Sequence, residues 1–301
     1  MPGHELDDAW KKLIWAKQHF EIVEFRVRQF EEFDEHTISC EVDAETGTYV
    51  FYVHGIRQTD DDLGLLIGDC LHNARTALDY LMVQLVARVT GTPPRDVERI
   101  QFPIYDDTKR FNGAVSEVIN EPGFSGYLAR IQELQPFNAR NASIWGNGPG
   151  GRPPNAQLPA ALARLAELDN IDKHRVLHAA CLVTAYRRSV FLEPPPGFEI
   201  VQGPIYKTHP LKDGAEVGHA MFKTPLPQEW EPDQVDMQRA FPIEVALDEP
   251  MPRQAVLEML PFCLRGVEHV LTLFAPVFRD GATALPVTTA PPTESMFDPV
   301  H

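Results

Sequence analysis

The residues best suited to chemistry form a polar stripe inside an apolar segment: His72, Arg75 and Asp79. On a helix, at about 100° per residue, these three side chains fall within roughly 60° of one another. An imidazole can transfer protons, and a guanidinium can hold an anion beside it. Residues 63–87 contain no lysine or glutamate, which an exposed helix face would normally carry. We therefore expect the stripe to be at least half buried and its charges to be paired.

A second polar cluster, DNIDKHRVLH, occupies residues 169–178. Here too Asp, His and Arg crowd together between apolar residues. If both segments are helices that face each other, the second cluster supplies partners for Arg75 and Asp79. The sequence thus predicts one candidate polar centre, made of His72, Arg75, Asp79, Asp172 and His174.

His174 and His178 also suggest a metal site as an alternative. Two histidines four residues apart on one helix can reach a single ion, and His72 or Asp79 from the facing helix would complete the site. Against this, no HExxH motif is present, and the neighbouring cationic side chains would repel a cation. We therefore expect no cofactor.

Apolar periodicity places these clusters in a mixed architecture. It predicts long helices over residues 5–33, 62–90, 158–181 and 253–275, with β-rich stretches at 36–56 and 189–248. Because the helices bracket the strands rather than alternate with them, we expect an α+β fold in which a helical bundle packs against an antiparallel β-sheet. We expect one domain over residues 1–280 and a flexible tail over 281–301. The Gly/Pro-rich stretch 146–159 is a candidate mobile loop.

The first helix carries apolar residues spaced alternately four and three apart, from Ala9 to Phe30. Such a stripe is typical of a helix docked on a bundle. A coiled-coil homodimer needs the same stripe and is the alternative.

Composition excludes several classes of partner. The 301 residues include 27 Lys and Arg against 43 Asp and Glu, a net charge of −16. This balance disfavours non-specific binding to nucleic acid or to an anionic membrane. The N-terminus does not resemble a signal peptide, and no segment reaches about 18 uninterrupted apolar residues. The 4 cysteines are widely spaced and form no CxxC pair, which is typical of a cytoplasmic protein.

Four motifs resemble an uncharacterised bacterial family that is common in actinobacteria and other soil bacteria. They are GDCLHNARTALDYL, QFPI, LQPF and NIDKHRVL, in this order between about residues 60 and 180. Members of the family share an LHNxRxALDxL helix and a later DKHR segment. The resemblance implies no established activity.

A looser similarity connects the stripe to HEPN domains, helical bundles of which many are metal-independent RNases or toxins. Their mark is an arginine followed four to six residues later by a histidine, but Arg75 is followed at that distance by Tyr80. His72, one turn before Arg75, would have to substitute. The first hypothesis is therefore a binding or regulatory module with an unidentified ligand, whose polar centre also fixes helix register. A degenerate HEPN-like RNase or defence toxin and a metal-binding helical protein are the alternatives.

Overall fold

A computed structural model describes most of the chain. The described residues are 5–32, 35–43, 45–92, 94, 97, 100–118, 122–139, 154–183, 199–207, 210–223, 241, 243–248 and 254–279. The helices are α1 (Asp7–Glu32), α2 (Leu63–Thr90), α3 (Thr108–Val118), α4 (Ser125–Glu133), α5 (Pro154–His174) and α7 (Val256–Arg279), with short 3-10 turns at Pro122–Phe124 and Pro136–Ala139. The strands are β1 (Thr37–Asp43), β2 (Thr48–His54), β3 (Ala179–Val183), β4 (Ile200–Tyr206), β5 (Glu216–Phe222) and β6 (Ile243–Leu247).

These elements confirm the α+β class and the antiparallel pairing of the strands. The chain divides into two compact units, each assembled from separated segments. Unit 1 holds residues 1–22, 65–176 and 260–301, and unit 2 holds residues 23–64 and 177–259. The predicted single domain over residues 1–280 stays a prediction, and both clusters of the predicted polar centre fall mainly in unit 1.

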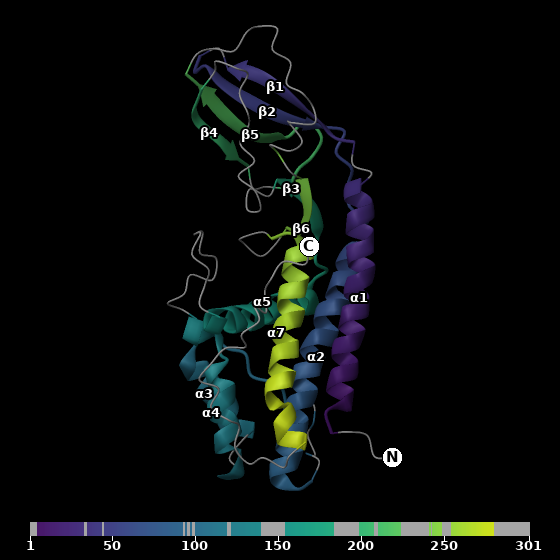
Figure 1. Cartoon of the computed structure of the whole chain (residues 1–301), viewed down its shortest axis with the longest axis vertical. Helices are drawn as coiled ribbons and strands as arrows, with labels where there is room; N and C mark the ends of the chain where they lie inside the picture. Colours follow the sequence, from purple (N-terminus) through teal and green to yellow (C-terminus); the bar gives the residue numbers. More distant parts are fainter. Residues whose placement is uncertain are drawn as a thin grey trace. The chain divides into compact units, whose positions relative to one another are not determined.

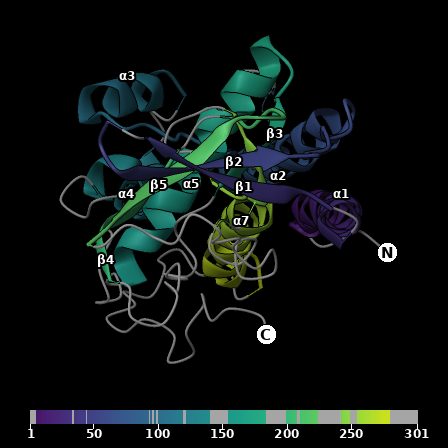
Figure 2. The ribbon, with the colours of Figure 1, turned by 90° about the horizontal axis from the view of Figure 1, so that it is seen from above.

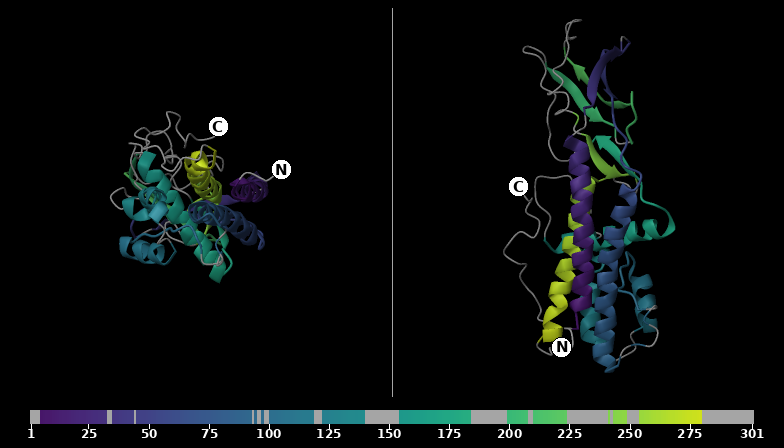
Figure 3. Two further views of the ribbon diagram at one scale, coloured as in Figure 1. Left: turned by 90° about the horizontal axis from the view of Figure 1, so that it is seen from below. Right: turned by 90° about the vertical axis from the view of Figure 1, so that its right-hand side faces the viewer.

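In unit 1, helices α1, α2 and α7 run alongside one another (Figures 1 and 3). Lys12 of α1 donates a hydrogen bond to Asn73 of α2 at 3.1 Å, and Lys17 of α1 forms an ion pair with Glu268 of α7 at 2.9 Å. The fully buried α2 side chains, each at most 1% exposed, are Ile67, Cys70, Leu71, Ala74, Ala77, Leu78, Leu81, Met82 and Leu85. Helix α2 is therefore a core helix, as its apolar run predicted.

The apolar stripe of α1 packs inside the chain. Its members Ala9, Leu13, Ala16, Val23 and Val27 are each 0–1% exposed. This finding confirms the docked helix, because the stripe is already covered by the chain's own residues. A homodimer stays a prediction, which would need a different surface.

Helices α5 and α7 approach each other closely at Gly266. A Cβ atom placed on Gly266 would lie 2.7 Å from the Cβ of Ala161, well inside van der Waals contact. Helix α7 is also long and apolar enough to cross a membrane by length and composition, but 56% of that window is buried within the structure. Core helices pass the same test.

Replacing Gly266 with alanine should lower the free energy of unfolding by about 1–3 kcal/mol, the usual cost of overpacking a core. The matched control is Gly113→Ala in α3, where a Cβ meets nothing within 4 Å. There the better helix propensity of alanine should stabilise the protein by up to about 1 kcal/mol. Urea unfolding of both variants measures the difference, and equal effects would contradict the close approach of α5 and α7.

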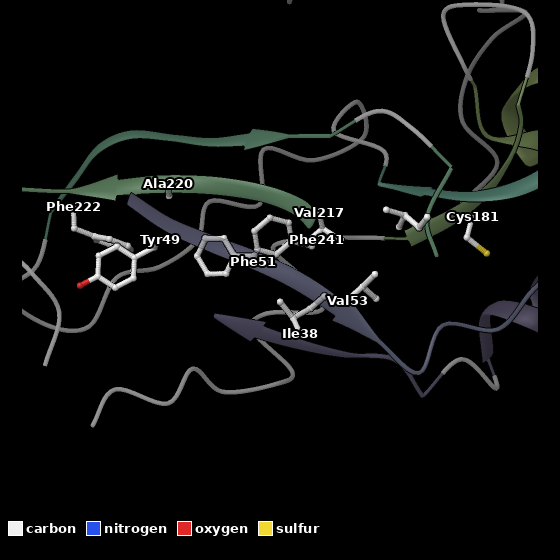
Figure 4. Close-up of a cluster of buried hydrophobic side chains, with 10 residues drawn as sticks. Ile38, Tyr49, Phe51, Val53, Cys181, Val217, Ala220, Phe222 and Phe241 are labelled. Carbon is white, nitrogen blue, oxygen red and sulfur yellow. The ribbon is translucent and has the colours of Figure 1, made fainter. Parts of the chain in front are cut away.

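Unit 2 contains two antiparallel sheets. One has the strand order β1-β2-β5-β4 and the other pairs β3 with β6, and Figure 2 shows the strands of the larger sheet side by side. The predicted hairpin is present, with Thr37 opposite His54 and Asp43 opposite Thr48. The side chains of Figure 4 form its core, with Phe51, Val53, Val217 and Phe241 fully buried.

The end of α5 corrects the prediction. We expected a helix over residues 158–181, but α5 ends at His174 and strand β3 begins at Ala179. The last residues of the expected helix instead pair with β6, with Cys181 opposite Val245. A short apolar run fits a buried strand as well as a helix, so periodicity alone could not separate the two. The predicted tail 281–301, residues 146–153 of the predicted loop and much of the stretch 189–248 lie outside the described residues, while residues 154–159 begin α5.

The four cysteines are free, and Cys70, Cys181 and Cys263 are buried. Burial raises the pKa of the Cys40 and Cys263 thiols to about 12. A thiol needs to ionise to act as a nucleophile. These two cysteines therefore have no nucleophilic character at neutral pH.

Candidate functional site

The segment between α2 and α3, residues 100–105, is called here the connector. It belongs to no strand, so its backbone polar groups need other partners. Arg75 and Asp79 of α2 supply them. Arg75 Nη2 donates to the carbonyl oxygen of Phe102 at 2.5 Å, and the N–H of Phe102 donates to Asp79 Oδ1 at 2.8 Å. The same Asp79 oxygen lies 3.4 Å from Arg75 Nη2. This arrangement explains why a core helix carries two charged groups.

Gln135, which follows α4, holds the rest of the connector. It is fully buried, and its Oε1 accepts a hydrogen bond from the Tyr105 N–H at 2.9 Å. Its Nε2 donates to the carbonyl oxygens of Pro103 at 2.8 Å and Ile131 at 3.0 Å. The motifs LHNxRxALDxL, QFPI and LQPF therefore meet in one hydrogen-bond network of side chains and connector backbone.

Opposing effects act on the pKa of Asp79. Burial raises it most, with a smaller rise from the charge of Asp169. Arg75, the N–H of Phe102 and Lys173 all lower it. Since the net pKa is raised, the ionised carboxylate costs stability that the protein regains as the pH falls towards the ordinary pKa of aspartate.

Helix α5 contributes a second polar pair, which faces α2. Asp169 is 4% exposed, and its Oδ2 accepts an ion pair from Lys173 Nζ at 2.7 Å. Its Oδ1 lies 3.8 Å from Nδ1 of His72, beyond hydrogen-bond distance. The sequence clusters on α2 and α5 thus face each other as expected, but the residue at the centre of the second cluster is Asp169.

Asp172 packs against the backbone of α2 at Gly68. A Cβ atom on Gly68 would lie 2.7 Å from Cγ and 2.8 Å from Oδ2 of Asp172. Burial raises the pKa of Asp172, and the nearby charges of Asp169 and Asp69 raise it further, while His72 lowers it. The carboxylate therefore depends on a glycine for its place and is not neutralised by a close cation.

Gly68→Ala should show a change of sign that depends on Asp172. In the wild-type background the new methyl group displaces the carboxylate, which cancels or exceeds the helix-propensity gain. In an Asp172→Ala background the same substitution should stabilise the protein by about 1 kcal/mol, the ordinary gain of alanine over glycine in a helix. A double-mutant cycle by urea unfolding measures the coupling. Additive effects would show that the two residues do not meet.

The predicted centre is therefore assembled in part. Arg75 and Asp79 form the predicted pair, with the connector backbone rather than the second cluster as their hydrogen-bond partner. The His72 side chain is 59% exposed, and His174 is exposed at the end of α5. His178 lies outside the helix, so the predicted metal pair one turn apart on a helix is wrong. Among the described residues no group of three or more His, Cys, Asp or Glu could hold a metal ion.

A cavity of about 350 Å³ opens beside the connector in unit 1. We call it the connector cavity. Its apolar walls include Met82 of α2 and Val115 of α3, and its polar walls include Arg75, Asp169 and Lys173. The remaining lining residues are Gln101, Phe102, Pro103, Ile104, Tyr105, Ala114, Ala166 and Asn170.

Sequence reasoning missed three polar residues of this region. Asp169 and Lys173 are separated by four residues, the spacing of a helical ion pair, so they could have been paired from the sequence. Gln135 bonds mainly to backbone atoms. Only its position within the LQPF motif gave a signal.

No protein-family model, curated protein or solved structure matches the chain. The resemblances drawn from the motifs therefore stay predictions, and the function has to be argued from the site.

Proposed function

We propose that the chain is a binding or regulatory module whose ligand is a small molecule held in the connector cavity. One observation carries the proposal: Arg75, a residue only 8% exposed, lines a cavity of about 350 Å³ and has an Nη1 atom with no hydrogen-bond partner among the described residues. Buried polar atoms are nearly always bonded, and unbonded ones concentrate at functional sites. The volume is at the lower end of the range for ligand pockets.

The shape of the site also supports binding. Connector residues Phe102 and Pro103 are held in place by Arg75, Asp79 and Gln135, so this wall of the cavity is already formed without a ligand. A preformed wall spares the ligand the free-energy cost of ordering a loop. The opposite charges around the cavity would set the orientation of a polar ligand.

A screen of small polar compounds by thermal unfolding tests the proposal. A ligand present at one hundred times its Kd should stabilise the protein by about 2.7 kcal/mol. The same compounds should fail on Ala114→Phe, which fills the cavity from α3. Asn112→Phe is the control, because Asn112 is exposed on the same helix and is not among the cavity-lining residues. Hits that act equally on both variants, or no hits at all, would overturn the proposal.

The metal-independent RNase is the alternative and has weaker support. A general base has to lie within hydrogen-bond reach of the reacting group, whereas His72 is turned towards Asp169 and is largely exposed. Arg75 already spends Nη2 on Phe102 and Asp79. We expect no cleavage of single-stranded RNA in the presence of EDTA. Cleavage by the wild type that disappears in Arg75→Ala would favour the RNase instead.

A further inference from the structure

The connector cavity is lined by two buried side chains that each have one atom without a hydrogen bond. These atoms are Nη1 of Arg75, a donor, and Oδ1 of Asp169, an acceptor, and neither has a partner among the described residues. The two residues are only 8% and 4% exposed. They come from different helices, α2 and α5, so the cavity offers a donor on one wall and an acceptor on another.

The charges of these two groups are already paired. Asp79 lies 3.4 Å from Nη2 of Arg75, and Lys173 Nζ lies 2.7 Å from Oδ2 of Asp169. A ligand that brought a net charge would leave that charge uncompensated in a partly buried site, which is unfavourable. The two atoms therefore lack hydrogen bonds, not counter-charges.

We infer that the connector cavity binds a small, uncharged molecule with an amide-type edge, in which a carbonyl oxygen sits beside an N–H group. The carbonyl oxygen accepts a hydrogen bond from Arg75 Nη1, and the N–H donates to Asp169 Oδ1. The rest of the molecule lies against the apolar lining of Met82, Phe102 and Val115. This inference rests on the proposed function and adds the chemical class of the ligand.

Four probes that share one phenyl ring separate this class from its rivals. Benzamide carries an uncharged acceptor and donor, benzoate an anionic acceptor only, benzamidinium a cationic donor only, and acetophenone an uncharged acceptor only. Affinities for the full chain are measured by ligand-observed NMR. We expect benzamide to bind at least about tenfold more tightly than each of the others, since one unmade buried hydrogen bond corresponds to about that factor.

A pair of aspartate variants assigns the binding to the cavity. Asp169→Ala removes the acceptor and should weaken benzamide by about tenfold, the equivalent of one hydrogen bond. Asp172→Ala is the control, because that carboxylate lies on the same helix and is not among the cavity-lining residues. It should leave the affinity for benzamide unchanged. The selectivity of the wild type among the four probes does not depend on whether either variant folds.

The outcomes distinguish the ligand class from the proposed function. If benzoate or benzamidinium binds more tightly than benzamide, and Ala114→Phe abolishes this binding, the amide class is wrong and the binding module stands. If benzamide binds equally to the wild type and to a folded Asp169→Ala variant, the inference is also wrong. If none of the four binds, the inference is overturned, and the compound screen alone decides the proposed function.

Discussion

Arg75→Ala should lower the free energy of unfolding by about 3–5 kcal/mol, the usual cost of removing one member of a buried ion pair. The substitution leaves Asp79 buried without its cation and leaves the carbonyl of Phe102 without its donor. Urea unfolding followed by circular dichroism measures the loss. The control is Arg28→Ala, because Arg28 forms an exposed pair with Glu24 at the same four-residue spacing. Its cost should stay below about 1 kcal/mol.

The loss in Arg75→Ala should also depend on pH. Arg75 lowers the pKa of Asp79, so its removal raises that pKa further above the value in the unfolded chain. A carboxyl group whose pKa is raised by folding costs stability when ionised and regains it as the pH falls through the raised pKa. The deficit should therefore be smaller at pH 5 than at pH 7, and Asp79→Asn added to Arg75→Ala should recover part of it. A neutral or stabilising effect of Arg75→Ala would mean that the arginine is kept for a ligand at a cost to the fold.

The pair of Arg75 and Asp79 was predictable because it depends only on helix geometry. The apolar run of α2 placed the helix within one residue of its observed bounds, and the four-residue spacing then put the two side chains on one face. Their main partner was not predictable in the same way. It is the backbone of Phe102, and backbone groups are present at every residue and leave no mark in the sequence.

The candidate centre on α5 was placed one turn too late for the same kind of reason. His174 and His178 drew attention because histidines are common in functional sites, yet α5 ends at His174 and the chain continues into β3. The residues VLHAACLV have an apolar character that suits either structure, and pairing with β6 decides between them. That pairing joins segments far apart in the chain, which local periodicity does not report.

Gln135→Glu should lower the free energy of unfolding at pH 7 by about 2–4 kcal/mol, the sum expected for two buried polar groups left without a partner. One carboxylate oxygen can still accept the hydrogen bond from the Tyr105 N–H. The other oxygen replaces a nitrogen that donates to Pro103 and Ile131, so it faces two carbonyl oxygens and repels them. Protonation of the buried carboxyl would restore one donor, and the variant should therefore recover part of its stability as the pH falls.

Asn138→Asp is the matched control for this prediction. The Asn138 amide nitrogen also donates to two backbone carbonyl oxygens, those of Gln132 at 2.6 Å and Glu133 at 3.2 Å, but the residue is exposed. Water can replace those hydrogen bonds, so the loss should stay below about 1 kcal/mol. A larger loss in Gln135→Glu, measured by urea unfolding at pH 7 and pH 5, would show that burial gives the Gln135 amide its value. Equal losses would mean that the connector is not held by Gln135, and the preformed wall of the cavity would then depend on Arg75 and Asp79 alone.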